Sequence, residues 1–249
     1  MSAITSFKRA LKQSKDDLEL KYKQLGSDAK SNMSVVRTDV INYLAHVIKK
    51  KNSTPRYLEI GVRNPEHNFN KVEIIEKYSV DPGLEYEKNP VDFQLTSDDF
   101  FKQMTSHDFK LFGKKFDLIF IDGLHKATQV QKDIKNSLNH LSNDGFIILH
   151  DCNPPTEWHA RSDFAYKWTP AEASWNGTTW KAFVQARHFD DLQSCCIDSD
   201  WGIGLISKAY KLGRPSAKLD EFFEFDYLEE NRLNLLGLIS FEELKQKLS

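Results

Sequence analysis

The chain lacks several features that would assign it to a common class of protein. It has three cysteines in 249 residues, an odd number, and Cys195 and Cys196 are adjacent, which argues against a disulfide framework. Its 34 basic residues nearly balance its 36 acidic ones, so no net charge attracts nucleic acid or an anionic membrane. No apolar run approaches the ~18 residues of a membrane span, and the N-terminus lacks the apolar stretch of a signal peptide. We therefore expect a cytoplasmic protein that binds neither nucleic acid nor membrane.

The sequence also lacks the glycine-rich loop that binds the phosphates of a dinucleotide. Gly61 closes the first apolar strand, but Arg63 and Pro65 occupy the positions where further glycines would stand. A pyrophosphate needs several bare backbone amides at a helix N-terminus. This pattern counts against an NAD-dependent oxidoreductase.

The sequence does contain an alternation of short apolar runs and helical segments. Strands are expected at 56–61, 78–80, 91–95, 116–122 and 145–151, with helices at 71–77, 100–104 and 128–141. Helices are also expected at 4–25, where the apolar face is ill-defined, and at 35–50, where an apolar stripe should pack against the sheet. Alternating strands and helices are typical of a parallel sheet.

After residue 152 the sequence changes character. Residues 153–177 are rich in Trp, Pro and His without a clear period, and such a long loop in a compact domain is usually a functional lid. A helix is expected after Thr178 or Thr179, followed by strands at 192–197 and 203–206. Because a short turn joins these two strands, they must form an antiparallel hairpin.

These segments predict one α/β domain over residues 1–249. Its centre, residues 56–208, is a Rossmann-like, doubly wound sheet of five parallel strands plus a terminal antiparallel hairpin, seven strands in all. N-terminal helices occupy residues 1–50, and a C-terminal helical extension occupies residues 219–249. The terminal helices are the expected surface for a homo-oligomer.

Polar side chains follow two of the expected strands at the point where each strand ends. The first of these strands ends in Asp122-Gly-Leu-His125, and the second ends in His150-Asp151. The carboxyl ends of parallel strands meet at one edge of a sheet, where such folds bind ligands. We expect these four side chains to border a ligand site.

Six motifs in order along the chain carry a more specific resemblance. They are Glu59-Ile-Gly-Val-Arg63, Ser79-Val-Asp81-Pro-Gly83, Thr96-Ser-Asp-Asp-Phe-Phe101, Phe120-Ile-Asp122-Gly-Leu-His125, Leu149-His150-Asp151-Cys-Asn-Pro-Pro155 and Trp175-Asn-Gly-Thr-Thr-Trp180-Lys-Ala-Phe183. With the expected fold, they resemble the class I S-adenosylmethionine-dependent methyltransferases over roughly residues 57–208. More narrowly, they resemble a bacterial small-molecule family with Asp-Gly-x-His and His-Asp signatures.

The resemblance implies how the cofactor binds. The Glu59-x-Gly61 pair would contact the methionine portion, with Gly61 allowing close approach, because any Cβ there would collide with it. A carboxylate at Asp81 would accept hydrogen bonds from both ribose hydroxyls. The same resemblance places Ser97 and Asp98 beside the adenine and Asp122 beneath the methionine amine or methyl group, while Arg63 either contacts the cofactor carboxylate or faces solvent. For Asp98, an ordinary acid at a helix N-terminus is an equally good interpretation.

The chemistry of methyl transfer to oxygen needs orientation and one base. His125 and His150 follow strand ends that border the expected methyl position, and a histidine can accept a proton near neutral pH. Loop hydrogen bonding is the alternative role for both. Asp122 and Asp151 could instead hold a divalent ion such as Mg²⁺, but Cys152 is a poor third ligand for a hard cation, so a metal is less favoured.

The leading hypothesis is an S-adenosylmethionine-dependent methyltransferase that O-methylates a small polar acceptor, such as a sugar or a hydroxylated metabolite. Tryptophans, His159 and Arg161 of the lid could shape the acceptor pocket. A cofactor-binding but catalytically silent module is the alternative that the eroded glycine loop supports. The NAD-dependent oxidoreductase is the third hypothesis.

Overall fold

A computed structural model describes residues 3–85, 90–165, 168–213, 215–216 and 224–249 of the chain. Its elements are α1 (Ala3–Ser31), α2 (Arg37–Lys49), β1 (Arg56–Ile60), the 3₁₀ helix η1 (Phe69–Lys71), β2 (Glu76–Val80), α3 (Ser97–Gln103), β3 (Phe116–Ile121), α4 (Ala127–His140), β4 (Leu141–Leu149), α5 (Thr179–Ala186), β5 (Gln193–Ile197), β6 (Ile203–Ser207), α6 (Phe225–Leu236), β7 (Leu238–Ile239) and α7 (Phe241–Leu248).

The strands form one sheet in the order β2-β1-β3-β4-β6-β5-β7. The first four are parallel, whereas β6 runs antiparallel to both β4 and β5. Every residue of β3 is buried, as expected for a central strand covered on both faces. The predicted α/β sheet of seven strands with an antiparallel hairpin is confirmed, but four strands and not five are parallel before the hairpin, and β7 lies at the edge beyond it.

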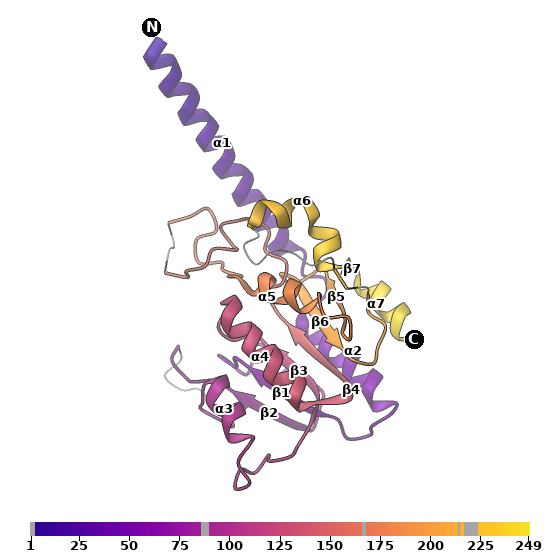
Figure 1. The fold of residues 1–249 in the computed structure, drawn as a ribbon. Coiled ribbons are helices and arrows are strands. Elements are labelled where there is room, and N and C mark those ends of the chain that lie inside the picture. The colour runs from indigo at the N-terminus through magenta and orange to yellow at the C-terminus, as the bar shows by residue number, and fades with distance from the viewer. Residues whose placement is uncertain (1–2, 86–89, 166–167, 214, 217–223) are drawn as a thin grey trace.

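Helices cover both faces of the sheet (Figure 1). Residues of α3, α4, α5 and α6 share one apolar cluster with one face, and residues of α2 and α7 share a second cluster with the other face. The apolar stripe expected at residues 35–50 is the buried side of α2. This arrangement leaves the carboxyl ends of β1, β2, β3 and β4 open at one edge. None of the helices in the described ranges is long and apolar enough to span a bilayer.

Two segments differ from the sequence-based expectation. The strand expected at 91–95 is reduced to one parallel bridge between Val80 and Phe93. The reason is that the Ser79 N–H donates to the Asp92 carboxylate at 2.9 Å and is not available to a backbone carbonyl of a further strand. The seventh strand is instead β7. The helix expected at 71–77 is wrong: η1 ends at Lys71, and the Lys77 ammonium donates to the Phe69 carbonyl, which holds a turn before β2.

The N-terminal helix is longer than expected. A stop was predicted at Gly26, but α1 continues to Ser31. Gly26 packs against the lid, where a Cβ would lie 3.0 Å from Cε1 of His159. The C-terminal segment divides into α6 and α7 at Gly237, which has a φ of +57°. The start of the predicted helical extension, residues 219–223, lies outside the described residues.

Candidate active site

A cavity of about 660 Å³ opens at the carboxyl edge of the parallel strands. It has the size of a small-molecule site. The loops after β1, β2 and β3 and the start of α3 all contribute to it. Its wall contains all seven residues predicted to bind the cofactor, together with His125: Glu59, Gly61, Arg63, Asp81, Ser97, Asp98 and Asp122.

Gly61 has a backbone reason to be glycine. Its φ is +91°, and a Cβ there would lie 2.2 Å from the carbonyl oxygen of Asp122. The glycine therefore lets the β1 loop approach the β3 loop, in addition to any contact with a ligand. Glu59, two residues earlier, is 4% exposed and accepts hydrogen bonds from the Tyr57 hydroxyl at 2.6 Å and the Asn68 amide at 2.9 Å.

The β2 end of the cavity carries Asp81, one of whose oxygens accepts a hydrogen bond from the Gly83 N–H at 2.7 Å. Arg63 lies at the cavity wall with its side chain 62% exposed and 3.2 Å from the Glu85 carboxylate. The position of Arg63 therefore agrees better with the predicted solvent-facing role than with a buried contact.

Ser97 and Asp98 meet α4 at another part of the wall. The Gln129 amide donates to Ser97 Oγ at 3.2 Å and to Asp98 at 3.0 Å, and it also reaches the buried Asp133 carboxylate at 3.1 Å. Thr96 is the N-cap of α3, since its hydroxyl accepts the Asp99 N–H. Asp98 therefore does more than place an acid at a helix N-terminus, because it also accepts a hydrogen bond from Gln129. Gln129 and Asp133 line the cavity and were not predicted.

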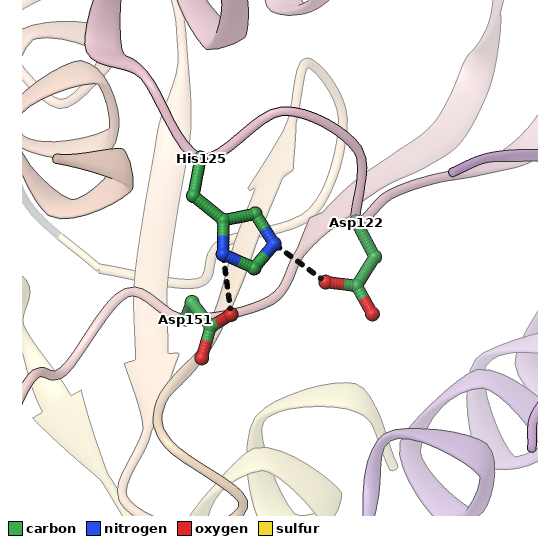
Figure 2. A group of neighbouring side chains, drawn as sticks. All are labelled: Asp122, His125 and Asp151. Atoms are coloured by element: carbon green, nitrogen blue, oxygen red, sulfur yellow. Dashed lines mark ion pairs between the residues drawn. The ribbon is translucent and has the colours of Figure 1, made fainter. Parts of the chain in front are cut away.

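The two strand-end motifs meet at His125 (Figure 2). Its Nε2 lies 3.3 Å from Asp122 Oδ1, and its Nδ1 lies 3.2 Å from Asp151 Oδ2. The His125 ring also stacks on Trp175 at 5.2 Å. The imidazole therefore bridges the carboxylates that end β3 and β4.

His150 lies beneath this bridge and is 5% exposed. Its Nδ1 is 3.2 Å from Asp122, and its Nε2 is 3.3 Å from Asp200. Asp200 in turn pairs with Arg37 at 3.0 Å, and Arg37 also donates to Asp122 at 2.8 Å. All the predicted catalytic and metal-binding residues are thus brought together, and two residues that sequence reasoning missed complete the network.

Neither missed residue carried a recognisable signal. Arg37 begins α2, and Asp200 lies in the β5–β6 turn, which the sequence marked only as a short connection. The backbone offers one hint, because Asp151 and Asp200 have φ values of +61° and +45°. Non-glycine residues in this region are strained, and such strain tends to occur at functional sites.

The electrostatic balance of the cluster favours charged side chains. Burial lowers the pKa of His125, but the carboxylates of Asp151 and Asp122 outweigh burial and raise it to about 9. Burial likewise opposes the charged form of His150, yet the same two carboxylates hold its pKa well above the usual range. Burial raises the pKa of Asp122, but His150, His125 and Arg37 together hold it well below the usual range. These directions favour ion pairs between Asp122 and its cationic neighbours His125, His150 and Arg37.

A second, smaller cavity of about 230 Å³ lies beside His150 and Asp151. Its lining consists of His150, Asp151, Ser174, Trp175, Asn176 and Trp201. The Asn176 amide donates to Asp151 at 2.7 Å. Trp175 borders both cavities.

The lid residues divide into two groups. Among the side chains expected to shape an acceptor pocket, Trp175 lines the cavities, and Phe164 and Ala173 join it there without having been predicted. Arg161 instead clamps the lid, because its guanidinium donates to three lid carbonyls, those of Trp158, Glu172 and Ser174. Trp180 is 1% exposed and belongs to the core.

Three side chains of the cluster offer ligand atoms for a divalent ion. Single ligand atoms of Asp122, His125 and Asp151 lie within 4.8 Å of one another. Two carboxylate oxygens and an imidazole nitrogen fit a divalent ion, although the nitrogen suits a transition metal better than Mg²⁺. Because His125 must lose its proton to ligate, metal binding would compete with the two ion pairs of the imidazole.

The central part of the chain matches a known protein family. Residues 43–152 match the family described as "Methyltransferase domain". The matched segment contains every predicted cofactor-binding, catalytic and metal-binding residue. The match supports the predicted methyltransferase class. No curated protein matches the chain.

Solved structures with similar folds include three methyltransferases. An O-methyltransferase from Bacillus cereus in complex with SAH is 13% identical, with 76% of this chain and 88% of that chain covered and a TM-score of 0.42. A putative O-methyltransferase from Klebsiella pneumoniae is 13% identical over 76% and 88%, with a TM-score of 0.43. SAH-bound PaMTH1 from Podospora anserina is 16% identical over 83% and 96%, with a TM-score of 0.38. Likenesses this low carry no argument about function.

Proposed function

We propose that the methyltransferase domain matched over residues 43–152 is of class I, binds S-adenosylmethionine and methylates a hydroxyl oxygen of a small polar acceptor, such as a sugar or a hydroxylated metabolite. The observation that supports this most is the convergence of the seven predicted cofactor residues and His125 on one cavity of about 660 Å³. We further propose that residues 1–249 act as one domain and that the enzyme is cytoplasmic. The free, buried state of all three cysteines agrees with a reducing compartment.

The cofactor supplies an electrophilic methyl group on a sulfonium sulfur. Glu59 and Gly61 would hold its methionine portion, Asp81 its ribose, and Ser97 with Asp98 its adenine. Asp122 lies between Arg37 and the two imidazoles, so its carboxylate is fixed in direction by three cations. Because these charges are already in place, they can orient the reacting groups, and the site need not rearrange during the reaction.

His125 is the proposed base. Methylation of a hydroxyl releases one proton, and the imidazole lies at the cavity wall beside Asp122. Its pKa of about 9 means that the base form grows as pH rises toward that value. His150, which contacts Asp122, Asp151 and Asp200, would act by holding these carboxylates in place.

A divalent ion is the less favoured part of the proposal. If present, Asp122, His125 and Asp151 would hold it, and it would lower the pKa of an acceptor hydroxyl. The cations Arg37, His125 and His150 already neutralise these carboxylates, which is why turnover is expected to survive EDTA.

Cofactor binding is tested by thermal shift with S-adenosylmethionine, its demethylated product and NAD. A ligand at one hundred times its dissociation constant stabilises the fold by ~2.7 kcal/mol. Stabilisation by the two sulfur compounds but not by NAD is expected. No shift with either sulfur compound would refute the proposal.

Catalysis is tested with radiolabelled S-adenosylmethionine and a panel of sugars and phenols, with and without EDTA. His125→Ala should abolish transfer while leaving product affinity unchanged. His46→Ala is the matched control, because His46 is an exposed histidine of α2 away from the cavity. Cofactor binding without transfer to any acceptor would favour the catalytically silent module.

A further inference from the structure

Helix α1 leaves the body of the protein and projects into solvent (Figure 1). Every residue from Lys8 to Leu18 is exposed, including Leu11 at 56% and Leu18 at 48%. Helices in proteins owe most of their stability to packing of an apolar face. This part of α1 has no such packing within the described residues of one chain.

The base of α1 is nevertheless anchored. Tyr22 meets the Trp158 ring edge-on at 6.3 Å, and Gly26 packs against His159. The Asn32 amide, just beyond the helix, donates to the Asp198 carbonyl at 3.0 Å. The body of the protein therefore fixes the direction in which the exposed half points.

The apolar spacing of α1 reads the same in both directions. Its members in the sequence are Ile4, Phe7, Leu11, Leu18, Tyr22 and Leu25. The intervals between them are 3, 4, 7, 4 and 3 residues, and at about 100° per residue all six positions fall on one helix face. A pattern symmetric about the point between Ser14 and Lys15 matches an antiparallel copy of itself. Leu11 of one copy then lies opposite Leu18 of the other.

The charges of α1 also favour antiparallel over parallel pairing of two copies. Residues 8–15 contain four basic side chains and no acidic one, and residues 16–19 contain three acidic side chains and no basic one. An antiparallel pair centred between Ser14 and Lys15 places Lys12 of one copy opposite Asp17 of the other, although Lys8 then lies opposite Lys21. A parallel pair in register would place like charges together, which is unfavourable.

We propose that α1 pairs with the α1 of a second copy of this chain in an antiparallel, two-fold symmetric dimer. Identical patches that contact each other are the usual geometry of homodimers. The pairing also supports the active site, because the base of α1 contacts the lid, and the Asn32 carbonyl accepts the Asp200 N–H at 3.2 Å. The proposal does not depend on the acceptor.

Sedimentation of the full chain over a range of concentrations tests the pairing. The wild type should form a dimer, and the double variant Leu11→Asp, Leu18→Asp should weaken association at least tenfold. Leu20→Asp is the matched control, because Leu20 is 68% exposed on the opposite helix face. The proposal is refuted if the wild type stays monomeric at every concentration. That result would be expected if α1 bound another protein or a lipid surface instead. A double variant that dimerises as the wild type does would also refute it.

Single cysteines test the direction of pairing, since the natural cysteines are buried. In the antiparallel dimer the two copies of position 14 are about 1.5 Å apart along the axis, whereas the two copies of position 21 are about 20 Å apart. Oxidation should therefore cross-link Ser14→Cys and not Lys21→Cys, given the short reach of a disulfide. Equal cross-linking of both variants would show a parallel pair and refute the antiparallel one.

Discussion

Replacement of Glu59 by Gln should change how the stability of the protein depends on pH. Glu59 is buried at the cavity floor, and burial raises its pKa from 4.5 to about 7, although hydrogen bonds from Tyr57 and Asn68 oppose the rise. The folded state therefore prefers the protonated acid. Its contribution to stability is fully present below the unfolded pKa and is lost as pH rises through about 7.

The magnitude follows from the gap of about 2.5 between the two pKa values. At about 1.36 kcal/mol for each pKa unit, the full effect is about 3 kcal/mol, of which about 2 to 3 kcal/mol falls between roughly pH 5 and pH 8. A glutamine at position 59 can keep an oxygen acceptor for the Tyr57 hydroxyl, which donates at 2.6 Å. It has no proton to lose, so the variant should lack this part of the pH dependence.

Urea unfolding of both proteins at pH 5 and pH 8 measures the effect. Other groups also titrate here, such as Asp133, whose pKa is raised to about 6 by burial. Because these groups are the same in both proteins, they cancel in the difference between the two pH dependences. If Glu59→Gln lost as much stability as the wild type between the two pH values, the reasoning about Glu59 would be wrong.

Three further changes test the site. Asp151→Asn should move the acid limb of the pH–rate profile from about pH 9 to lower values, because Asp151 helps raise the pKa of His125; a limb that does not move would remove His125 as the base. Arg37→Met should destabilise the protein by about 3 kcal/mol in urea unfolding, since it leaves the buried Asp200 without its guanidinium partner; a change under ~1 kcal/mol would contradict this. Gly61→Ala should lower the free energy of unfolding by at least about 2 kcal/mol, because its φ is +91° and its Cβ would meet the Asp122 carbonyl, whereas Gly113→Ala, which has a similar φ of +70° in open space, should lose less.

Local apolar patterns in the sequence correctly predicted the strands and helices whose own residues form the buried face. The apolar run 116–121 is β3, and the stripe after residue 35 is the buried side of α2. The expected helix at 71–77 failed because a long-range contact, sheet pairing with β1, overrides its local preference. The expected stop at Gly26 failed because close packing on His159 gives that glycine a different use.

The lid shows the same limit at the level of single side chains. Its length and composition were visible, but the division into residues that face the cavities and residues that hold the loop was not. Trp175 faces both cavities, whereas Arg161 binds lid carbonyls. Loop residues have no period that assigns a direction to each side chain.

By itself, the sequence determined that Gly61, Asp81, Asp122 and Asp151 lie at one edge, because parallel strands must bring their carboxyl ends together. Tertiary structure alone decided what surrounds them. Arg37 reaches Asp122 across 85 positions of sequence and Asp200 across 163, and both contacts depend on how α2 and the β5–β6 turn pack on the sheet. A side chain's charge state depends on these neighbours, so the charged state of His125 is a property of the fold and not of the Asp-Gly-x-His motif.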